Sequence, residues 1–579
     1  MYIKTLMYLF YIIETYLKQN IMKNYLAFFL FCISSIANAQ VFEWAKSFGG
    51  SLNEMANSIA VDAAGNIYLT GRFQGTADFN PEAGVFNMTS FGQDDIFIVK
   101  LTASGSFVWA KQMGGTSIED GNSIAVDNAG NIYLTGLFDG TTDFDPSAAI
   151  FNYTAIGNSD IFVVKLDSDG NFIWAKQMGG TGEETGINIA LDLFGNVYTI
   201  GNFEGTADFD PGVNDFIVTS SNVDVYISKL DSDGNFVWAK KIGGSSWDVG
   251  YFISTDSDGN LYTTGHFSGV ADFDPNAGVI NLSSAGGTDV FVCKLDGNGN
   301  FLWAKKMGGA QDDRGNSLGR DALNNVYITG YFRGIADFDP SAITFNLTAG
   351  GNRDIFVCKI DSVGNFVWAK SMGDIGIETG QSIATDSNGN CFVTGTFAGF
   401  VDFDPGPNSV ILQTAGNSDV FIQKLDSSGN FVWVKKIGAI SADVSSQILI
   451  DSNGGVLTIG KYVGIVDFDP DVSEFNLTSA GDDDVFILKL GNNALSNYRN
   501  TYQNAFLIYP NPTRGIFTIE TNIKAGQVDI YNLIGKKIFT ATTQSKKVVI
   551  DISKESKGVY FLTLEDEKGN LLTQKIVLN

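Results

Sequence analysis

The sequence has few of the residues on which most enzyme chemistry depends. It contains one histidine, His266, which excludes a catalytic triad, proton relay or metal cluster that needs two. Only four cysteines occur in 579 residues, and Cys32 lies in the N-terminal apolar segment. Cys293, Cys358 and Cys391 occupy strand positions too far apart for disulfides, so we expect them to be small buried hydrophobes. With 37 basic residues against 64 acidic ones, the net charge of -27 argues against a nucleic-acid partner.

What the chain has instead is an internal repeat. The stretch Gly170–Lys176 (Gly-Asn-Phe-Ile-Trp-Ala-Lys) returns along the sequence with its tryptophan every 64 or 65 residues. A period of this length indicates a repeat architecture. Because each tryptophan stands mid-strand beside alanine or valine, we expect these side chains in the core. They are Trp44, Trp109, Trp174, Trp238, Trp303, Trp368 and Trp433.

The second repeat best indicates the structure of one unit. Strands are predicted at Ser123–Asp127, Ile132–Phe138, Asp160–Leu166 and around Trp174, joined by turns that place glycine where φ must be positive. The unit is therefore predicted to be a four-stranded antiparallel meander.

The strands of this unit are apolar on both faces, as residues 161–164 (Ile-Phe-Val-Val) illustrate. An antiparallel sheet with one wet face should alternate, so both faces must be covered. No segment with helical periodicity is available to cover them. The sequence predicts an all-β fold in which residues 40–490 form a seven-bladed β-propeller of four-stranded antiparallel blades.

The last repeat lacks its tryptophan strand. It stops after Asp484–Leu490, whereas the chain after the N-terminal segment begins with an orphan strand, Phe42–Lys46. We therefore predict that the Trp44 strand closes the last blade.

The two ends of the chain differ from the repeats. Residues 1–39 contain an apolar run followed by Ala37-Asn38-Ala39, the form of a signal peptide cleaved after Ala39, with Met22 as the expected true start. We expect no transmembrane span in the mature chain. Residues 491–505 are polar and aperiodic, so we interpret them as a linker. Residues 506–579 form a second module of short alternating strands.

The repeat motifs resemble those of a known family. Gly121–Asp127 and Gly130–Gly136, with the Trp-Ala-Lys and Gly-Gly elements, resemble the bacterial SBBP β-propeller repeat over residues 41–490. That resemblance implies a propeller and no common activity. The last repeat departs from the pattern most, with Gly438-Ala439 in place of Gly-Gly.

The tail resembles the type A C-terminal sorting domain of the type IX secretion system. The motifs lie in the expected order at Tyr509–Gly515, Ile530–Lys536, Lys557–Tyr560 and Lys575–Leu578. The resemblance implies a small immunoglobulin-like β-sandwich, a host in the Bacteroidetes lineage, and secretion machinery as the partner of residues 506–579. It also implies transfer across the outer membrane, followed by release or anchoring at the cell surface. An ordinary terminal β-sandwich is the alternative.

A ring of acids is the first candidate binding site. Each repeat has one acid four residues after the second residue of Gly-Gly, in a loop expected at the mouth of the central channel. These acids could hold a cation or guide a basic ligand. The alternative is that each caps a turn or pairs with a recurring lysine. They are Glu54, Glu119, Glu184, Asp248, Asp313, Glu378 and Asp443.

Asp-Phe-Asp-Pro motifs form a second acidic set. Carboxylates two residues apart are found in calcium loops, although the rest of an EF-hand is missing. The alternative is a turn in which the aspartate accepts hydrogen bonds from backbone N–H groups. The sequence therefore requires no cofactor, and Ca²⁺ is the one that these motifs could hold. The residues are Asp143, Asp145, Asp208, Asp210, Asp272, Asp274, Asp337, Asp339, Asp402, Asp404, Asp467 and Asp469.

Two further positions bear on ligand binding. Trp247 has no counterpart in other repeats, so we expect an exposed aromatic contact. His266 falls in a slot that varies widely between repeats, so we expect the slot to face solvent; the alternative is that it lines a binding surface. The other occupants of the slot are Arg72, Leu137, Asn202, Tyr331, Thr396 and Lys461.

These features favour a secreted or surface-displayed, monomeric binding or adhesion module for an extracellular glycan or protein. A polysaccharide hydrolase or lyase that uses channel-mouth acids such as Glu119 and Glu184 is one rival, and a structural surface-layer protein is another.

Overall fold

A computed structural model describes residues 40–471, 473–492, 506–521, 525–532, 536–542, 546–566 and 571–579. The predicted signal segment 1–39 and nearly all of the linker 491–505 lie outside this part of the chain. One compact unit spans Phe42–Gly491, and the C-terminal residues belong to a second unit. Within the described residues all regular structure is β, and every strand pairing with a defined register is antiparallel.

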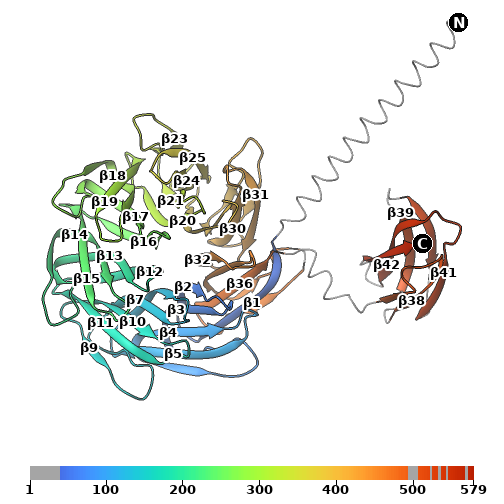
Figure 1. Cartoon of the computed structure of the whole chain (residues 1–579), viewed down its shortest axis with the longest axis horizontal. Coiled ribbons are helices and arrows are strands. Elements are labelled where there is room, and N and C mark those ends of the chain that lie inside the picture. The colour runs from blue at the N-terminus through green and yellow to red at the C-terminus, as the bar shows by residue number, and fades with distance from the viewer. Residues whose placement is uncertain are drawn as a thin grey trace, which may run out of the picture. The chain divides into compact units, whose positions relative to one another are not determined.

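The large unit repeats a four-stranded meander (Figure 1). The first strands are β2 (Glu54–Val61), β6 (Glu119–Val126), β12 (Glu184–Leu191), β16 (Val249–Thr255), β20 (Arg314–Arg320), β26 (Thr379–Thr385) and β32 (Val444–Ile450). The second strands are β3 (Ile67–Asp78), β7 (Ile132–Phe138), β13 (Val197–Asp208), β17 (Leu261–Asp272), β21 (Val326–Phe332), β27 (Cys391–Phe397) and β33 (Val456–Tyr462).

The third and fourth strands complete each meander. The third strands are β4 (Asn87–Leu101), β10 (Asp160–Leu166), β14 (Ile217–Leu230), β18 (Asn281–Leu295), β24 (Asp354–Ile360), β30 (Asp419–Leu425) and β36 (Asp484–Gly491). The fourth strands are β5 (Phe107–Gly115), β11 (Phe172–Gly180), β15 (Phe236–Gly244), β19 (Phe301–Gly309), β25 (Phe366–Met372), β31 (Phe431–Ile437) and β1 (Val41–Gly50).

Short hairpins extend some repeats beyond the second and third strands. Their strands are β8 (Thr141–Asp143), β9 (Asn152–Thr154), β22 (Ile335–Asp337), β23 (Asn346–Thr348), β28 (Phe400–Asp402), β29 (Ile411–Gln413), β34 (Ile465–Asp467) and β35 (Asn476–Thr478).

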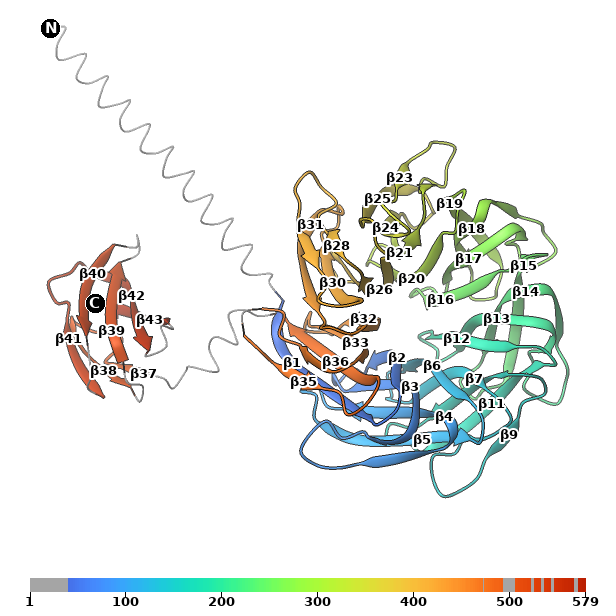
Figure 2. The ribbon, with the colours of Figure 1, turned by 180° about the vertical axis from the view of Figure 1, so that it is seen from behind.

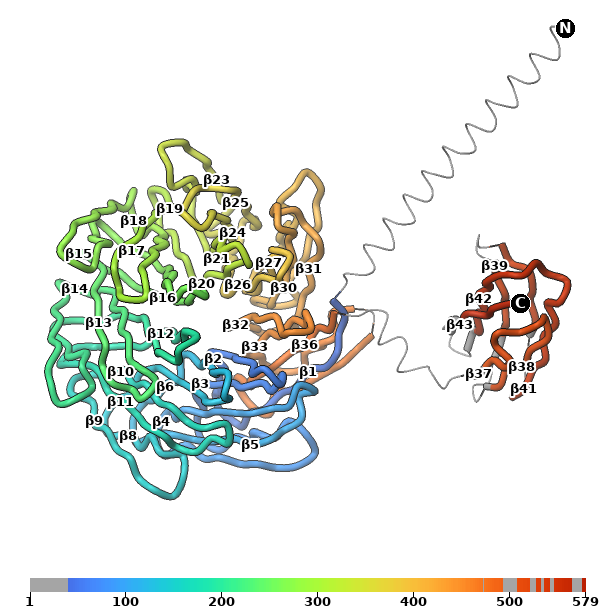
Figure 3. Tube along the Cα trace, in the orientation of Figure 1, coloured from blue at the N-terminus to red at the C-terminus, as the bar shows by residue number. Residues whose placement is uncertain are grey.

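The first strands lie around the middle of the unit (Figure 2). Each contacts the first strand of the next repeat, and β32 contacts β2. β1 is the hydrogen-bonded neighbour of β36, so the predicted pairing of the Trp44 strand with the last repeat is present. The first and last strands of the unit therefore belong to the same sheet (Figure 3).

The core lies between neighbouring sheets, as the two-faced apolar strands predict. Ile161, Phe162, Val163 and Val164 are all fully buried. The phenylalanine of each Asp-Phe-Asp-Pro motif is buried too; the ring of Phe144 packs 5.2 Å from that of Phe162. Cys293, Cys358 and Cys391 are buried and free, which confirms their expected role.

The repeated tryptophans differ from expectation because they are only partly buried. Five of them, Trp44, Trp109, Trp174, Trp238 and Trp368, pack at the edge of the core against a hairpin turn of the next repeat. A Cβ atom on Gly170 would lie 3.2 Å from the ring of Trp109, and one on Gly105 would lie 3.2 Å from Trp44. The indoles therefore link neighbouring sheets through their turns.

The C-terminal unit contains two antiparallel sheets. Their strands are β37 (Phe506–Tyr509), β38 (Ile516–Thr521), β39 (Ala525–Asn532), β40 (Lys537–Thr542), β41 (Lys547–Asp551), β42 (Gly558–Asp566) and β43 (Leu571–Leu578). One sheet is β37-β38-β41 and the other is β40-β39-β42-β43. Residues of both sheets, such as Phe517 and Leu562, belong to a single hydrophobic cluster.

Candidate functional site

The acids that follow Gly-Gly are buried beneath their own loops. Glu119 is fully buried; the backbone N–H of Gly115 donates to its Oε2 (2.8 Å) and the Thr142 hydroxyl donates to its Oε1 (3.0 Å). Matching bonds run from Gly50 to Glu54, Gly180 to Glu184, Gly244 to Asp248, Gly309 to Asp313 and Ala439 to Asp443. Glu378 is equally buried. This is the turn-capping arrangement that the sequence left open as the alternative to a channel-mouth ring.

A second buried acid lies beside each of these carboxyl groups. For Glu119 it is Asp95 of β4, which accepts a hydrogen bond from Gln112 (2.6 Å). The Gly-Gly pair runs between the two acids, and a Cβ on Gly114 would lie 2.3 Å from the Asp95 Cγ. Gly114 must therefore be glycine because the Asp95 carboxyl group lies too close for a Cβ atom, and not because of its backbone φ angle.

Burial and the neighbouring acids raise the pKa values of the acids that follow Gly-Gly. Burial, opposed by the Gly115 N–H and reinforced by Asp95, raises the pKa of Glu119 to about 7. The same cause raises the pKa of Glu54 and Glu378 to about 8, that of Glu184 and Asp313 to about 7, and that of Asp248 to about 6. These groups therefore titrate near neutral pH.

The Asp-Phe-Asp-Pro aspartates hold their own loops through backbone bonds. Asp143 Oδ1 accepts from the N–H of Asp145 (3.1 Å) and of Phe151 (2.8 Å), and Asp145 Oδ1 accepts from Ser147 (2.9 Å). The same pattern repeats at Asp208/Asp210, Asp272/Asp274, Asp337/Asp339, Asp402/Asp404 and Asp467/Asp469. In the described residues no group of three or more His, Cys, Asp or Glu side chains is placed to hold a metal ion.

Calcium removal tests these loops. We expect EDTA to lower the melting temperature by less than about 1 °C. The reason is that Oδ1 of the first aspartate in each motif already accepts hydrogen bonds from backbone N–H groups. Differential scanning calorimetry with EDTA and then with excess CaCl₂ measures this. A rise of about 5 °C or more in CaCl₂, absent in a matched MgCl₂ sample, would instead assign Ca²⁺ to the motif.

A cavity at the middle of the large unit is lined by residues from all of the first strands. Its volume is about 430 Å³. A β-bulge interrupts each first strand, for example between Gly121 and Ser123, and the bulged residue faces the cavity. The bulged residues are Asn57, Asn122, Ile187, Tyr251, Asn316, Gln381 and Ser446.

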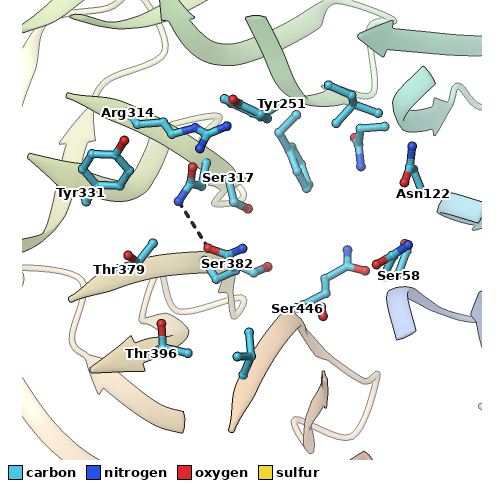
Figure 4. Close-up of a pocket in the computed structure, with 18 of the residues that line it drawn as sticks. Ser58, Asn122, Tyr251, Arg314, Ser317, Tyr331, Thr379, Ser382, Thr396 and Ser446 are labelled. Atoms are coloured by element: carbon cyan, nitrogen blue, oxygen red, sulfur yellow. Dashed lines mark hydrogen bonds between the residues drawn. The ribbon is translucent and has the colours of Figure 1, made fainter. Parts of the chain in front are cut away.

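Amides and hydroxyls dominate this lining (Figure 4). Several amides are already oriented by the next repeat: Asn122 Nδ2 donates to the Gly186 carbonyl (2.9 Å) and Asn316 Nδ2 to the Gly380 carbonyl (2.9 Å). Sequence reasoning missed these residues. The available signal was the residue three positions after each buried acid, which is polar in every repeat except the third, where it is Ile187.

Cations and aromatic rings gather at one side of the cavity. The Arg314 guanidinium lies over the ring of Tyr251, 4.1 Å from its centroid, and that of Arg353 lies 4.8 Å from the centroid of Tyr331. Burial lowers the pKa of Arg314, and the nearby Arg353 acts in the same direction. Figure 4 shows Arg314, Tyr251 and Tyr331 on the same side of the cavity.

The expectation of an exposed His266 is wrong. The residue is 4% exposed, and its ring packs 5.5 Å from both Trp247 and Tyr251. Burial lowers the pKa of His266 to about 4, so the ring is neutral at pH 7. Trp247 is 55% exposed, which confirms the predicted exposure.

Comparison with known families agrees with this architecture. The Beta-propeller repeat family, SBBP, matches residues 43–72 and 108–144, and the Secretion system C-terminal sorting domain family matches residues 507–579. The chain thus contains β-propeller repeats of the SBBP type. It also carries a type IX secretion sorting domain, which makes it a secreted or cell-surface protein with the secretion machinery as a partner. The described residues contain no helix long and apolar enough to cross a membrane.

Curated relatives are distant. An uncharacterized WD repeat-containing protein of Acanthamoeba polyphaga mimivirus is 25% identical over 62% of this chain, and Regulatory protein FlaEY of Caulobacter vibrioides is 23% identical over 63%. Ulvan lyase NLR42 of Nonlabens ulvanivorans is 24% identical over 39%. These alignments cover 30%, 41% and 40% of the respective relatives, so the chain spans less than half the length of each.

Solved structures give only weak similarity. PorZ, a type-IX secretion component of Porphyromonas gingivalis, aligns over 90% of this chain and 81% of its own, with 10% identity and a TM-score of 0.25. Sqt1 from Chaetomium thermophilum aligns over 78% of this chain and 100% of its own, with 10% identity and a TM-score of 0.38.

Proposed function

We propose that the large unit is a closed ring of seven four-stranded blades, followed by an immunoglobulin-like sorting domain. The pairing of β1 with β36 and the contact of β32 with β2 support closure, since they join the ends of the repeat array. A ring of this kind presents loops and a central cavity on a rigid frame, which suits recognition.

We further propose that this secreted unit binds an extracellular glycan at its central cavity. The observation that carries the proposal is the lining of a cavity of about 430 Å³ by amide and hydroxyl side chains. Such groups donate and accept hydrogen bonds, which is what a polyhydroxylated ligand needs.

A polysaccharide lyase or hydrolase is the second candidate, favoured by the partial similarity to ulvan lyase NLR42. The acids first considered for that chemistry, Glu119 and Glu184, are fully buried, which argues against their acting as general acid or base on a polymer. The test of binding therefore measures turnover on the same ligands.

The experiment is a glycan-array screen followed by calorimetric titration of the best ligand. We expect Asn316→Ala and Gln381→Ala to weaken binding about tenfold each, because both side chains line the cavity. Asn298→Ala is the control, since Asn298 is exposed on a hairpin turn outside the cavity. Binding unchanged in both cavity variants would refute the site, and release of new sugar ends would assign catalysis.

A further inference from the structure

Three positions in each repeat form a layer beside the cavity. The first position directly follows the buried acid on the first strand. The second is the residue that pairs with it on the second strand. The third directly precedes the second buried acid, the aspartate on the third strand. In the fifth repeat these are Arg314, Tyr331 and Arg353. Arg314 pairs with Tyr331 across the β20–β21 ladder, and all three residues line the cavity.

Elsewhere in this layer cations have acidic partners. Arg72 Nη1 lies 2.9 Å from Asp120 Oδ2, and Lys461 Nζ lies 2.6 Å from Asp483 Oδ2. Within the described part of the chain, neither Arg314 nor Arg353 has a carboxylate within ion-pair distance.

The two arginines are also incompletely hydrogen-bonded. The Nε atoms of Arg314 and Arg353 are buried and have no hydrogen-bond partner. Half-buried cations without a counter-charge are unfavourable in a folded protein, and two of them side by side are more so. Their retention at one side of a polar cavity is explained if an anion completes the site.

Stacking fixes the orientation of both cations. Arg314 lies over Tyr251 and Arg353 over Tyr331, which limits the planes that the guanidinium groups adopt. A guanidinium held in one plane presents its N–H groups as a fork that matches the two oxygens of a carboxylate or sulfate.

Aromatic rings continue from this pair toward solvent. Tyr251 packs against His266, and His266 packs edge-on against the half-exposed Trp247. The cations thus lie at one end of a row of rings, and Trp247, at the other end, is the ring exposed to solvent.

We propose that Arg314 and Arg353 form an oxyanion subsite of the cavity, which takes the carboxylate or sulfate group of an acidic polysaccharide. This inference rests on the proposed glycan-binding function and narrows its ligand class. The net charge of -27 repels polyanions at long range, so attraction is confined to this subsite rather than spread over the surface.

The test compares three probes at 0.15 M ionic strength: polygalacturonate for carboxylate, dextran sulfate for sulfate, and neutral dextran. Arg314→Gln and Arg353→Gln are expected to weaken binding of at least one acidic probe by about tenfold or more. Arg72→Gln is the matched control, because it removes the same charge from the same layer where Asp120 already pairs with it. We expect it to change binding less than about twofold.

A second measurement separates this subsite from the proposed function. Sodium sulfate is expected to raise the melting temperature of the wild-type chain more than that of Arg314→Gln with Arg353→Gln, at matched ionic strength. Sulfate protection lost in the double variant supports the subsite even if no polysaccharide binds. Equal binding of neutral and acidic probes by wild type and both variants would support the cavity and overturn the subsite. Equal sulfate protection in all variants would overturn it too.

Discussion

Replacing Gly136 by alanine is expected to cost about 3 kcal/mol or more of unfolding free energy, and to prevent folding of its sheet in a chain of ordinary stability. Gly136 lies in β7 opposite the bulge of β6. An added Cβ would lie 1.8 Å from the Asp120 carbonyl oxygen and 2.8 Å from the Phe162 ring. Backbone on one side and a fully buried ring on the other leave no room for relaxation.

Urea unfolding followed by intrinsic fluorescence measures this loss. Gly205→Ala is the control, because nothing lies within 4 Å of the Cβ position there and the only cost is its φ of 74°. That cost is about 1–2 kcal/mol. An equal loss in the two variants would show that steric exclusion at Gly136 is not what the bulge requires.

Stability is expected to fall as the pH rises from about 5.5 to 8, with a drop in melting temperature of about 5–10 °C. Burial raises the pKa of the ring acids above the unfolded value of 4.5, to about 7 for Glu119 and about 8 for Glu54. Over this interval the folded chain binds more protons than the unfolded chain, so each unit of pH favours unfolding. His266, whose pKa burial lowers to about 4, acts in the opposite direction below pH 6.5, but it is a single group.

Calorimetric scans between pH 5 and 8.5 at fixed salt measure this dependence. Glu119→Gln removes one titrating group while leaving an oxygen for the Gly115 N–H, so we expect a smaller loss of stability between pH 6 and 8. Glu82→Gln, at an exposed turn, should leave the slope unchanged. A wild-type melting temperature that is constant or rises over this range would contradict the assigned ionisation.

The sequence predicted the strands well because turn chemistry and two-faced apolar strands are local signals. The strands Ile132–Phe138 and Asp160–Leu166 were predicted with the observed bounds. The orphan Trp44 strand could be assigned to the last repeat because only one sheet lacked a member. Periodicity gives equivalent positions in this way.

Periodicity does not say which way an equivalent side chain points. The acids were expected at a channel mouth, but Glu119 faces its own loop, while the bulge after Gly121 turns Asn122 to the cavity. One extra residue in a strand reverses the face of those that follow, and sequence pattern alone does not mark it.

The position of His266 was expected to face solvent, and this expectation failed for a related reason. Variation between repeats was interpreted as exposure, yet His266 is buried against Trp247 and Tyr251. Arg72 forms an ion pair with Asp120 of the next repeat. The partner lies 48 positions away in the sequence, so the constraint on Arg72 is not visible from the variation at its own position.

The pairing of β1 with β36 constrains how the chain reaches its final state. These strands come from opposite ends of Phe42–Gly491, so β1, whose other neighbour is β3, lacks its pairing with β36 until the last repeat is present. An unpaired strand edge invites association with other chains during that interval. Truncation anywhere before β36 should therefore produce insoluble protein rather than a smaller soluble array, because β1 would then keep an unpaired edge.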